Sequence, residues 1–376
     1  MLFQNVSLLS VGYVLPPLVI TSADIETQLV SLYQRLKLPQ GRLEGMSGIR
    51  ERRLWHPKTR ISDMSAESCR RALSAANVQP RDVQCLIHAS VCREYLEPAT
   101  ACRVHHLTGL PENAWVYDVS NACLGVMNGA VQIAQLIESG VIRAGLVVGT
   151  EDCRGLLEAT IHQLNADSSL TRQSIKPAFA SLTIGSGSCA WLLGDRGYFE
   201  AKSPGFGARV CGAVAVARTQ HHELCQSDTD QAGSGMQPIM NTDSELLLEA
   251  GVATGKAAFD MLLAELSWQR TEIGATVCHQ VGSAHRRRML ETLGMPVETD
   301  FATFERLGNT GSVALPTALG VGLSQSQFQA GTKSALLGIG SGLNSVMMGI
   351  EFGKIAVRGV GIEVISDGTD DGQIQP

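Results

Sequence analysis

The chain has little aromatic or charged character and lacks features that mark several protein classes. Aromatic residues make up 5% and charged residues 18% of its 376 positions, and the formal net charge is -6. Without a basic excess, a broad nucleic-acid-binding surface is disfavoured. No run is apolar and long enough to cross a membrane, and no positive segment precedes Arg35, as a signal peptide requires. We therefore expect a cytoplasmic protein without a membrane span and without a nucleic-acid partner.

Paired cysteines are also missing. None of the ten cysteines forms a C-x-x-C pair, which disfavours a zinc ribbon or a thioredoxin-type site. His221, His222 and Cys225 have a loose metal-like spacing, but no second ligand cluster accompanies them, and we expect no metal. Most cysteines lie in apolar runs and are interpreted as small buried hydrophobes.

Apolar and small residues are abundant instead. Hydrophobic residues reach 44%, with 39 glycines, which indicates a sizeable core in which backbones approach closely. Two segments, 120–150 and 307–340, share one layout: a polar pivot, a small-residue helix, a glycine-containing turn and a buried strand. A duplicated fold that buries one helix of each copy at its centre explains why both helices are apolar all round.

This layout predicts an α/β protein in two halves. Residues 1–200 form the first half, and residues 244–357 form the second. Residues 201–243 are rich in Gly, Gln and Ser and are interpreted as a connection with a surface excursion. The acidic tail, 358–376, has no helical or strand period and is expected to be flexible.

Cys123 stands out among the cysteines because it lies between an expected strand at 116–119 and a helix. Backbone N–H groups and the helix dipole there favour the thiolate and predict a lowered pKa. A cysteine at such a junction is a core residue more often than a nucleophile. The second copy, however, offers His279 at a strand end and Asn309 at the matching pivot, and a nucleophilic cysteine needs such partners.

Six motifs then occur in the order found in one family. They are SGIRERR (47–53), EPATAC (97–102), SNACLG (120–125), HQVG (279–282), GNTGSVALP (308–316) and GIGSG (338–342). With them the chain resembles thiolase-superfamily condensing enzymes of the ketoacyl synthase III type. The resemblance implies duplicated βαβαβαββ halves in a five-layered α-β-α-β-α sandwich. Degradative thiolases carry a second cysteine in the last glycine-rich turn, and its absence here speaks against that branch.

The resemblance also implies roles for these residues. Cys123 becomes the acylated nucleophile, and its backbone N–H forms an oxyanion hole with that of Ser341. His279 and Asn309 hydrogen-bond the thioester carbonyl of the second substrate and stabilise its enolate. Coenzyme A serves as the substrate carrier, and no cofactor is expected.

Two further pairs are weaker candidates for substrate binding. Gly340 and Gly342 flank the predicted oxyanion turn. Arg286 and Arg287 lie on an expected helix, where they meet the coenzyme A phosphates or simply form a solvated helix face.

Glu97 separates the branches of the family. Ordinary ketoacyl synthase III enzymes have an apolar residue here, which reaches across the dimer interface into the partner's acyl channel. A carboxylate in that channel is costly unless it has a task, and removal of an α-proton from an acyl thioester is such a task. The OleA family of head-to-head hydrocarbon synthesis uses a glutamate from the other subunit at this position. Alternatively, Glu97 caps a helix that starts at Pro98 and faces solvent.

The favoured function is therefore non-decarboxylative Claisen condensation of two long-chain acyl-CoAs. It gives a 2-alkyl-3-oxo acid for olefin or hydrocarbon biosynthesis. A homodimer and downstream hydrocarbon-pathway enzymes are the expected partners. The main alternative is a decarboxylating 3-oxoacyl-acyl-carrier-protein synthase III that uses malonyl-acyl carrier protein. A thioesterase or an acyltransferase that uses the same acyl-cysteine stays open as well.

Overall fold

The same strand order occurs twice in the computed structural model, which describes residues 1–227 and 240–361. The order is β5-β4-β6-β7-β1 in the first half and β11-β12-β13-β8 in the second. In each half the pairings are parallel at one edge, β5 with β4 and β4 with β6 in the first half and β11 with β12 in the second, and antiparallel after that. The first-half strands are β1 (Val6–Val14), β4 (Cys85–Ala89), β5 (Trp115–Val119), β6 (Ala144–Glu151) and β7 (Gly187–Asp195). The second-half strands are β8 (Gly207–Ala217), β11 (Ile273–Cys278), β12 (Lys333–Gly340) and β13 (Asn344–Lys354).

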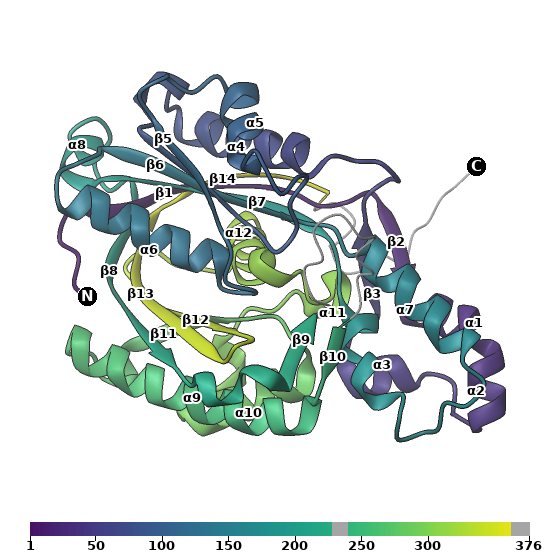
Figure 1. Ribbon diagram of the computed structural model, residues 1–376. Coiled ribbons are helices and arrows are strands. Elements are labelled where there is room, and N and C mark those ends of the chain that lie inside the picture. The colour runs from purple at the N-terminus through teal and green to yellow at the C-terminus, as the bar shows by residue number, and fades with distance from the viewer. Residues whose placement is uncertain (228–239, 362–376) are drawn as a thin grey trace, which may run out of the picture.

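Helices cover both outer faces and fill the space between the half-sheets (Figure 1). In that view α4 and α5 lie outside the first half-sheet, α9 and α10 lie outside the second, and α6 and α12 lie between them. All but the last two residues of α12 are buried, because this helix contacts strands of both halves. The predicted five-layered α-β-α-β-α sandwich is thus confirmed. These helices are α4 (Ile61–Ala76), α5 (Thr100–Thr108), α6 (Gly125–Glu138), α9 (Ser244–Leu266), α10 (Ser283–Leu293) and α12 (Ala314–Ser324).

Glycine lets the inner helix α12 approach the first half-sheet closely. A Cβ atom built on Gly320 would lie 2.8 Å from Cγ1 of Val11 and 2.9 Å from Cδ1 of Tyr13 in β1. At these distances either the helix or the strand has to move, because protein interiors are already close-packed. The glycine-rich composition therefore serves the contact between layers.

The second half begins earlier than the sequence predicts. Strand β8 lies inside segment 201–243, so that part of the segment is a buried strand of the sheet and not a connection. Its sequence, GARVCGAVAVA, contains two glycines and four alanines, and this small-residue composition conceals the strand. At the other end, β14 (Ala356–Val360) pairs with β1, so the sheet extends past the predicted start of the tail at 358. Residues 362–376 of that tail lie outside the described residues.

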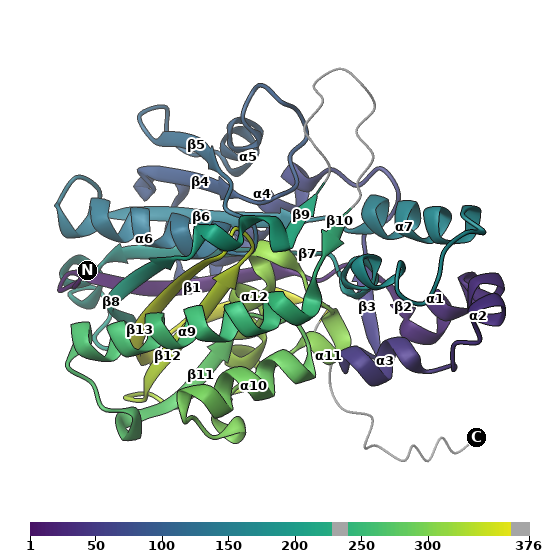
Figure 2. The same cartoon turned by 60° about the horizontal axis from the view of Figure 1, so that its bottom comes forward.

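A smaller lobe lies at one end of the sandwich (Figure 2). The helical stretch 22–36 is divided at Leu29 into α1 and α2. In the described ranges no helix is long and apolar enough to span a membrane. The lobe contains α1 (Ser22–Gln28), α2 (Val30–Leu36), α3 (Arg42–Ser47), α7 (Arg154–Ala166), β2 (Leu18–Thr21) and β3 (Glu51–Leu54). The remaining short elements are α8 (Arg196–Glu200), α11 (Phe304–Leu307), β9 (Cys225–Ser227) and β10 (Met240–Thr242).

Candidate active site

The predicted catalytic residues follow the carboxyl ends of parallel strands. Glu97 lies in the loop after β4, and Cys123 follows β5. In the second half, His279 follows β11 directly, and Gly340 ends the neighbouring strand β12. Crevices at the carboxyl ends of parallel strands are the usual ligand sites of α/β sheets, so this edge is the candidate active site.

Cys123 lies in a sharp turn between β5 and α6. Ala122 has a left-handed backbone, with φ of 44°, and the N–H of Leu124 donates to the carbonyl oxygen of Asn121 at 2.9 Å. Burial, followed by the charge of Glu151, raises the pKa of Cys123 to about 12. The predicted lowering of this pKa is therefore wrong, because desolvation of the thiolate outweighs the helix N-terminus. A thiol in this state has to give up a proton when it attacks.

The glycine turn after β12 lies against this cysteine. A Cβ atom built on Gly340 would be only 3.5 Å from the backbone nitrogen of Cys123. Residues 341–343 then form the turn into β13. The contact brings two backbone segments from opposite halves together, as the predicted oxyanion hole with Ser341 requires. The roles of Ser341 and Gly342 themselves remain predictions.

His279 is buried and held at the end of β11. Its backbone N–H donates to the carbonyl oxygen of Leu337 in β12 at 3.0 Å. Burial and then the nearby His285 lower the pKa of His279 to about 3, so the imidazole is neutral at neutral pH. Its ring atom Nδ1 has no hydrogen-bond partner within the described ranges. A neutral ring with a free nitrogen suits hydrogen bonding to a substrate and proton transfer.

Asn309 presents a fixed amide just before α12. Its backbone is held on both sides, because its N–H donates to the oxygen of Thr183 at 3.0 Å and its own oxygen accepts from Gly185 at 2.9 Å. The side-chain Oδ1 accepts from the N–H of Gly311 at 3.1 Å. The amide NH2 is therefore the end that remains to donate to a carbonyl oxygen.

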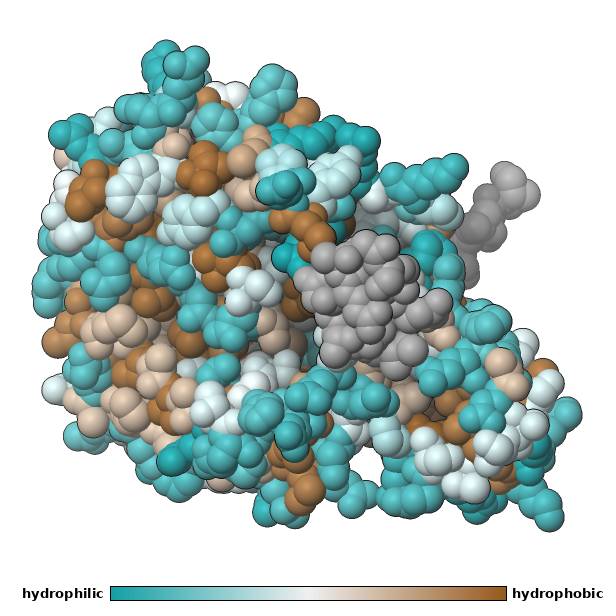
Figure 3. All heavy atoms as spheres, viewed as in Figure 1, coloured by the Kyte–Doolittle hydropathy of each residue, from teal (hydrophilic) through white to brown (hydrophobic). Residues whose placement is uncertain are grey.

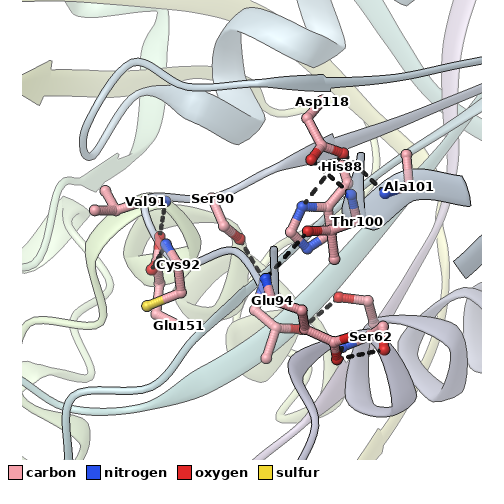
Figure 4. Close-up of polar contacts among 12 residues, drawn as sticks. Ser62, His88, Ser90, Val91, Cys92, Glu94, Thr100, Ala101, Asp118 and Glu151 are labelled. Carbon is pink, nitrogen blue, oxygen red and sulfur yellow. Dashed lines mark hydrogen bonds and ion pairs between the residues drawn. The ribbon is translucent and has the colours of Figure 1, made fainter. Parts of the chain in front are cut away.

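Glu97 is exposed in the single chain, and it does not cap a helix. Helix α5 begins at Thr100 and not at Pro98. Its first N–H groups donate instead to the carboxylate of Asp118, at 2.7 Å from Thr100 and 2.8 Å from Ala101 (Figure 4). The helix terminus is thus already satisfied, and the alternative role of Glu97 as a cap is wrong.

The two arginines of α10 differ in their surroundings. The Nε of Arg286 lies 2.7 Å from the buried carboxylate of Asp300, and its guanidinium also donates to the oxygen of Val297. These contacts tie α10 to the segment that precedes Asn309. Arg287 is exposed and is therefore accessible to a ligand. Its binding of the coenzyme A phosphates stays a prediction.

Sequence reasoning missed a buried carboxylate beside the cysteine. Glu151 ends β6 and accepts hydrogen bonds from the backbone of Val91 and Cys92 and from Ser312. The available signal was an acidic residue at the end of an otherwise uncharged strand, AGLVVGTE. Cys225, in the segment interpreted as a connection with a surface excursion, is also near enough to act electrostatically on Cys123.

Comparisons with known proteins agree with this geometry. Residues 46–176 match the family "Thiolase, N-terminal domain", and residues 263–352 match "3-Oxoacyl-[acyl-carrier-protein (ACP)] synthase III C terminal". A protein named acyl-CoA:acyl-CoA alkyltransferase from Shewanella oneidensis is 36% identical over 94% of this chain and 100% of its own length. One of the same name from Xanthomonas campestris is 32% identical over 92% of this chain and 98% of its own length.

Solved structures extend the likeness to three dimensions. A crystal structure of Xanthomonas campestris OleA with bound lauric acid and lauroyl-CoA has a TM-score of 0.86 and 31% sequence identity. The match covers 93% of this chain and 100% of that one. Variants of that enzyme at a cysteine, a glutamate and a histidine have also been solved.

Proposed function

Because the chain belongs to the acyl-CoA:acyl-CoA alkyltransferase (OleA) family, we propose that it joins two long-chain acyl-CoAs by non-decarboxylative Claisen condensation. The observation that carries the proposal is the glutamate in the β4–α5 loop, together with Cys123 and His279, which follow β5 and β11, and Asn309, which precedes α12. In Xanthomonas OleA the substituted cysteine follows the substituted glutamate at the same separation as Cys123 follows Glu97.

In the first half-reaction the sulfur of Cys123 attacks the thioester carbonyl of one acyl-CoA. The carbon–sulfur bond to coenzyme A breaks, and the thiol proton passes through neutral His279 to the leaving thiolate. Backbone N–H groups of Cys123 and Ser341 stabilise the negative oxygen of the intermediate. The result is an acyl-Cys123 thioester and free coenzyme A.

In the second half-reaction a carboxylate removes the α-proton of the second acyl-CoA. We assign this step to Glu97 of the partner subunit. His279 and the amide NH2 of Asn309 donate to the enolate oxygen, and the α-carbon then attacks the acyl-Cys123 carbonyl. A carbon–carbon bond forms, and the cysteine sulfur leaves. Hydrolysis of the remaining thioester gives the 2-alkyl-3-oxo acid, a substrate for downstream hydrocarbon-forming enzymes.

The position of this loop supports the homodimer that we propose. Strand β5 is an edge strand, paired only with β4 within the described residues, and Trp115 on it is 54% exposed. Leu96, beside Glu97, is 57% exposed. An open edge with exposed apolar side chains is a template for pairing with another copy. Figure 3 shows the side of the molecule on which β5 lies, and on this side hydrophobic residues are interspersed with hydrophilic ones. Cytoplasmic location stays a prediction.

The test is incubation of the purified protein with myristoyl-CoA alone, followed by extraction and mass spectrometry. The proposal expects a long-chain ketone, formed by spontaneous loss of CO2 from the 3-oxo acid. Free myristic acid without any carbon–carbon bond formation would contradict it and would indicate a thioesterase. Two blank reactions accompany this test. One contains water in place of the protein, and the other contains the Cys123→Ala variant.

One observation favours a second candidate, the decarboxylating synthase III. The match of residues 263–352 to the synthase III C-terminal family supplies it. This enzyme generates its carbanion by loss of CO2 and needs no base. With myristoyl-CoA and malonyl-acyl carrier protein, it would yield a 3-oxoacyl product whether or not Glu97 is present.

A further inference from the structure

The carboxylate of Glu151 connects two loops of the candidate site. Its side chain is buried, and the residue is 5% exposed. Oε1 accepts from the N–H of Val91 at 3.0 Å, and Oε2 accepts from the N–H of Cys92 at 3.2 Å (Figure 4). On its other side, Oε1 accepts the hydroxyl of Ser312 at 2.5 Å. A carboxylate that satisfies donors from two separate segments acts as a clamp between them.

The two clamped segments carry different parts of the proposed chemistry. Val91 and Cys92 begin the loop of residues 90–99, which bears Glu97. Ser312 belongs to the short 3-10 turn Gly311–Val313, which follows Asn309. The side chain of Glu151 also packs on this turn, because a Cβ atom built on Gly311 would lie 3.3 Å from its Cγ. Glu151 therefore lies between the loop that bears Glu97 and the turn that follows Asn309.

The loop of residues 90–99 has further anchors near its start, and one of them is the N–H of Asp152, which donates to Sγ of Cys92 at 3.4 Å. The N–H of Thr150, the neighbour of Glu151, donates to the hydroxyl of Ser90 at 2.7 Å. Further along, Glu94 accepts from the hydroxyl of Ser62 at 2.5 Å. Between Glu94 and helix α5, residues 95–98 are exposed. The exposed tip is therefore held through the anchored residues 90–94. Among these anchors, the two hydrogen bonds to Glu151 fix the backbone N–H groups of Val91 and Cys92, which are consecutive.

We propose that Glu151 is a positioning residue that aligns Glu97 for the partner's site and Asn309 for its own site. The inference rests on the proposed function, since it requires Glu97 to act across the dimer. One side chain then links the two active sites of the dimer. If the carboxylate of Glu151 is lost in one chain, Glu97 of that chain should be misplaced, and condensation at the partner's site should slow.

The experiment uses heterodimers made by co-expression of two differently tagged chains. In the parent heterodimer one chain carries Cys123→Ala, so that only the other chain has a working thiol. The base at that working site then comes from the Cys123→Ala chain. Glu151→Gln is added to either chain. Coenzyme A release in a single turnover reports acylation, and mass spectrometry of the product reports condensation.

Glu151→Gln in the Cys123→Ala chain is expected to lower condensation at the partner's working site by about tenfold, because sub-ångström misplacement of a base is costly. Acylation of the working Cys123 should stay within about twofold, because no contact of its own chain changes. In the thiol-bearing chain, Glu151→Gln should lower condensation through Asn309. Ser312→Ala removes only the link to that turn, so it should act in the thiol-bearing chain alone.

Two controls separate the possible failures. Glu97→Ala in the Cys123→Ala chain tests the proposed function, and an unchanged condensation rate would overturn that function together with this inference. If Glu97→Ala abolishes condensation but Glu151→Gln in the same chain leaves it within twofold, only the positioning role is overturned. Glu26→Gln is the matched control, because Glu26 is a buried carboxylate that likewise accepts two backbone N–H groups and a hydroxyl, far from the site.

Ser312→Ala also covers the case in which Glu151→Gln fails to fold. Thermal unfolding of both variants is compared with that of Glu26→Gln. Ser312→Ala is placed in the thiol-bearing chain or in the Cys123→Ala chain. If it lowers condensation by the same factor in both cases, Glu151 does not act separately on Asn309 of its own site and on Glu97 at the partner's site, and the proposal is overturned.

Discussion

The two halves share one strand order but differ in the connections that leave their parallel strands. In the first half, β4 is followed by the loop of residues 90–99 before α5 begins, whereas residues 279–282 alone separate β11 from α10. The first half also has a complete edge strand, β5. At the matching place in the second half, the described residues form only an isolated bridge between Thr276 and Asp300.

This difference assigns a different chemistry to each half. The short connection keeps His279 buried against β12, where it is neutral and available to hydrogen-bond. The long loop leaves Glu97 exposed and beside an open sheet edge, where a second subunit is able to receive it. In the proposed function, duplication supplies two equivalent strand ends, and loop length decides whether a residue serves its own site or a partner's. The proposed nucleophile and base come from the first half, and the proposed neutral donors come from the second.

The strongest way to break this division is to remove the base from the first half. Glu97→Ala is expected to lower condensation by about 10²- to 10⁴-fold, the usual contribution of a general base. Acylation of Cys123 should persist, because Glu97 is exposed in its own chain and has no role in the first half-reaction proposed above. Intact-protein mass spectrometry after myristoyl-CoA addition measures acylation, and product analysis measures condensation.

Cys123→Ala is the control for this prediction, and it should lose both acylation and condensation. Glu97→Gln keeps the size of the side chain and removes its basicity. If Glu97→Gln condensed at the normal rate, the carboxylate would not be the base, and the division of chemistry between the halves would fail.

The neutral donors of the second half should matter next. Asn309→Ala is expected to lower condensation by about 10²- to 10³-fold, as the loss of one preorganised donor does. The effect should fall on kcat more than on KM, because the enolate is stabilised more than the ground state. Steady-state kinetics with myristoyl-CoA test this. An equal loss of acylation would show that Asn309 serves the first half-reaction instead.

Much of this division between the halves could be predicted from the sequence. The features that could not be predicted were missed for physical reasons. Cys123 and His279 follow strands that hydrophobic runs mark clearly, and Asn309 precedes a helix of small apolar residues. Burial was not readable, so the direction of the pKa shift of Cys123 was predicted wrongly. Glu151 was missed because its partners are backbone N–H groups and a serine, which leave no charge pattern. The strand β8 was missed because alanine and glycine carry little β signal.

The pH dependence of folding stability allows the two halves to be compared, because each half contains a buried histidine. Burial lowers the pKa of His88 in β4 to about 4 and that of His279 to about 3. The unfolded chain takes up protons near the ordinary histidine pKa, about 6.5, while the folded state stays neutral. Stability is therefore constant above this value and falls as pH decreases toward the folded pKa. The slope is about 1.4 kcal/mol per pH unit for each group.

Denaturant unfolding between pH 7.5 and 5 measures this slope. His88→Asn and His279→Asn should each flatten it by a similar amount, because both rings are buried. A variant that leaves the slope unchanged would show that its histidine is protonated equally in the folded and unfolded states. His106→Asn, at an exposed residue, serves as the control substitution.

The smallest effect is expected at α10 of the second half, where two neighbouring arginines have different surroundings. Arg287→Ala should raise KM for acyl-CoA by no more than about fivefold, the worth of an exposed ion pair with a phosphate, and added salt should erase the difference. Arg286→Ala should lower thermal stability instead, because it leaves the buried carboxylate of Asp300 without its cation. Measured KM at low and high salt, beside thermal unfolding, separates the two. If Arg287→Ala left KM unchanged at low salt, this helix face would be solvated only, and recognition of coenzyme A phosphates would belong to other residues.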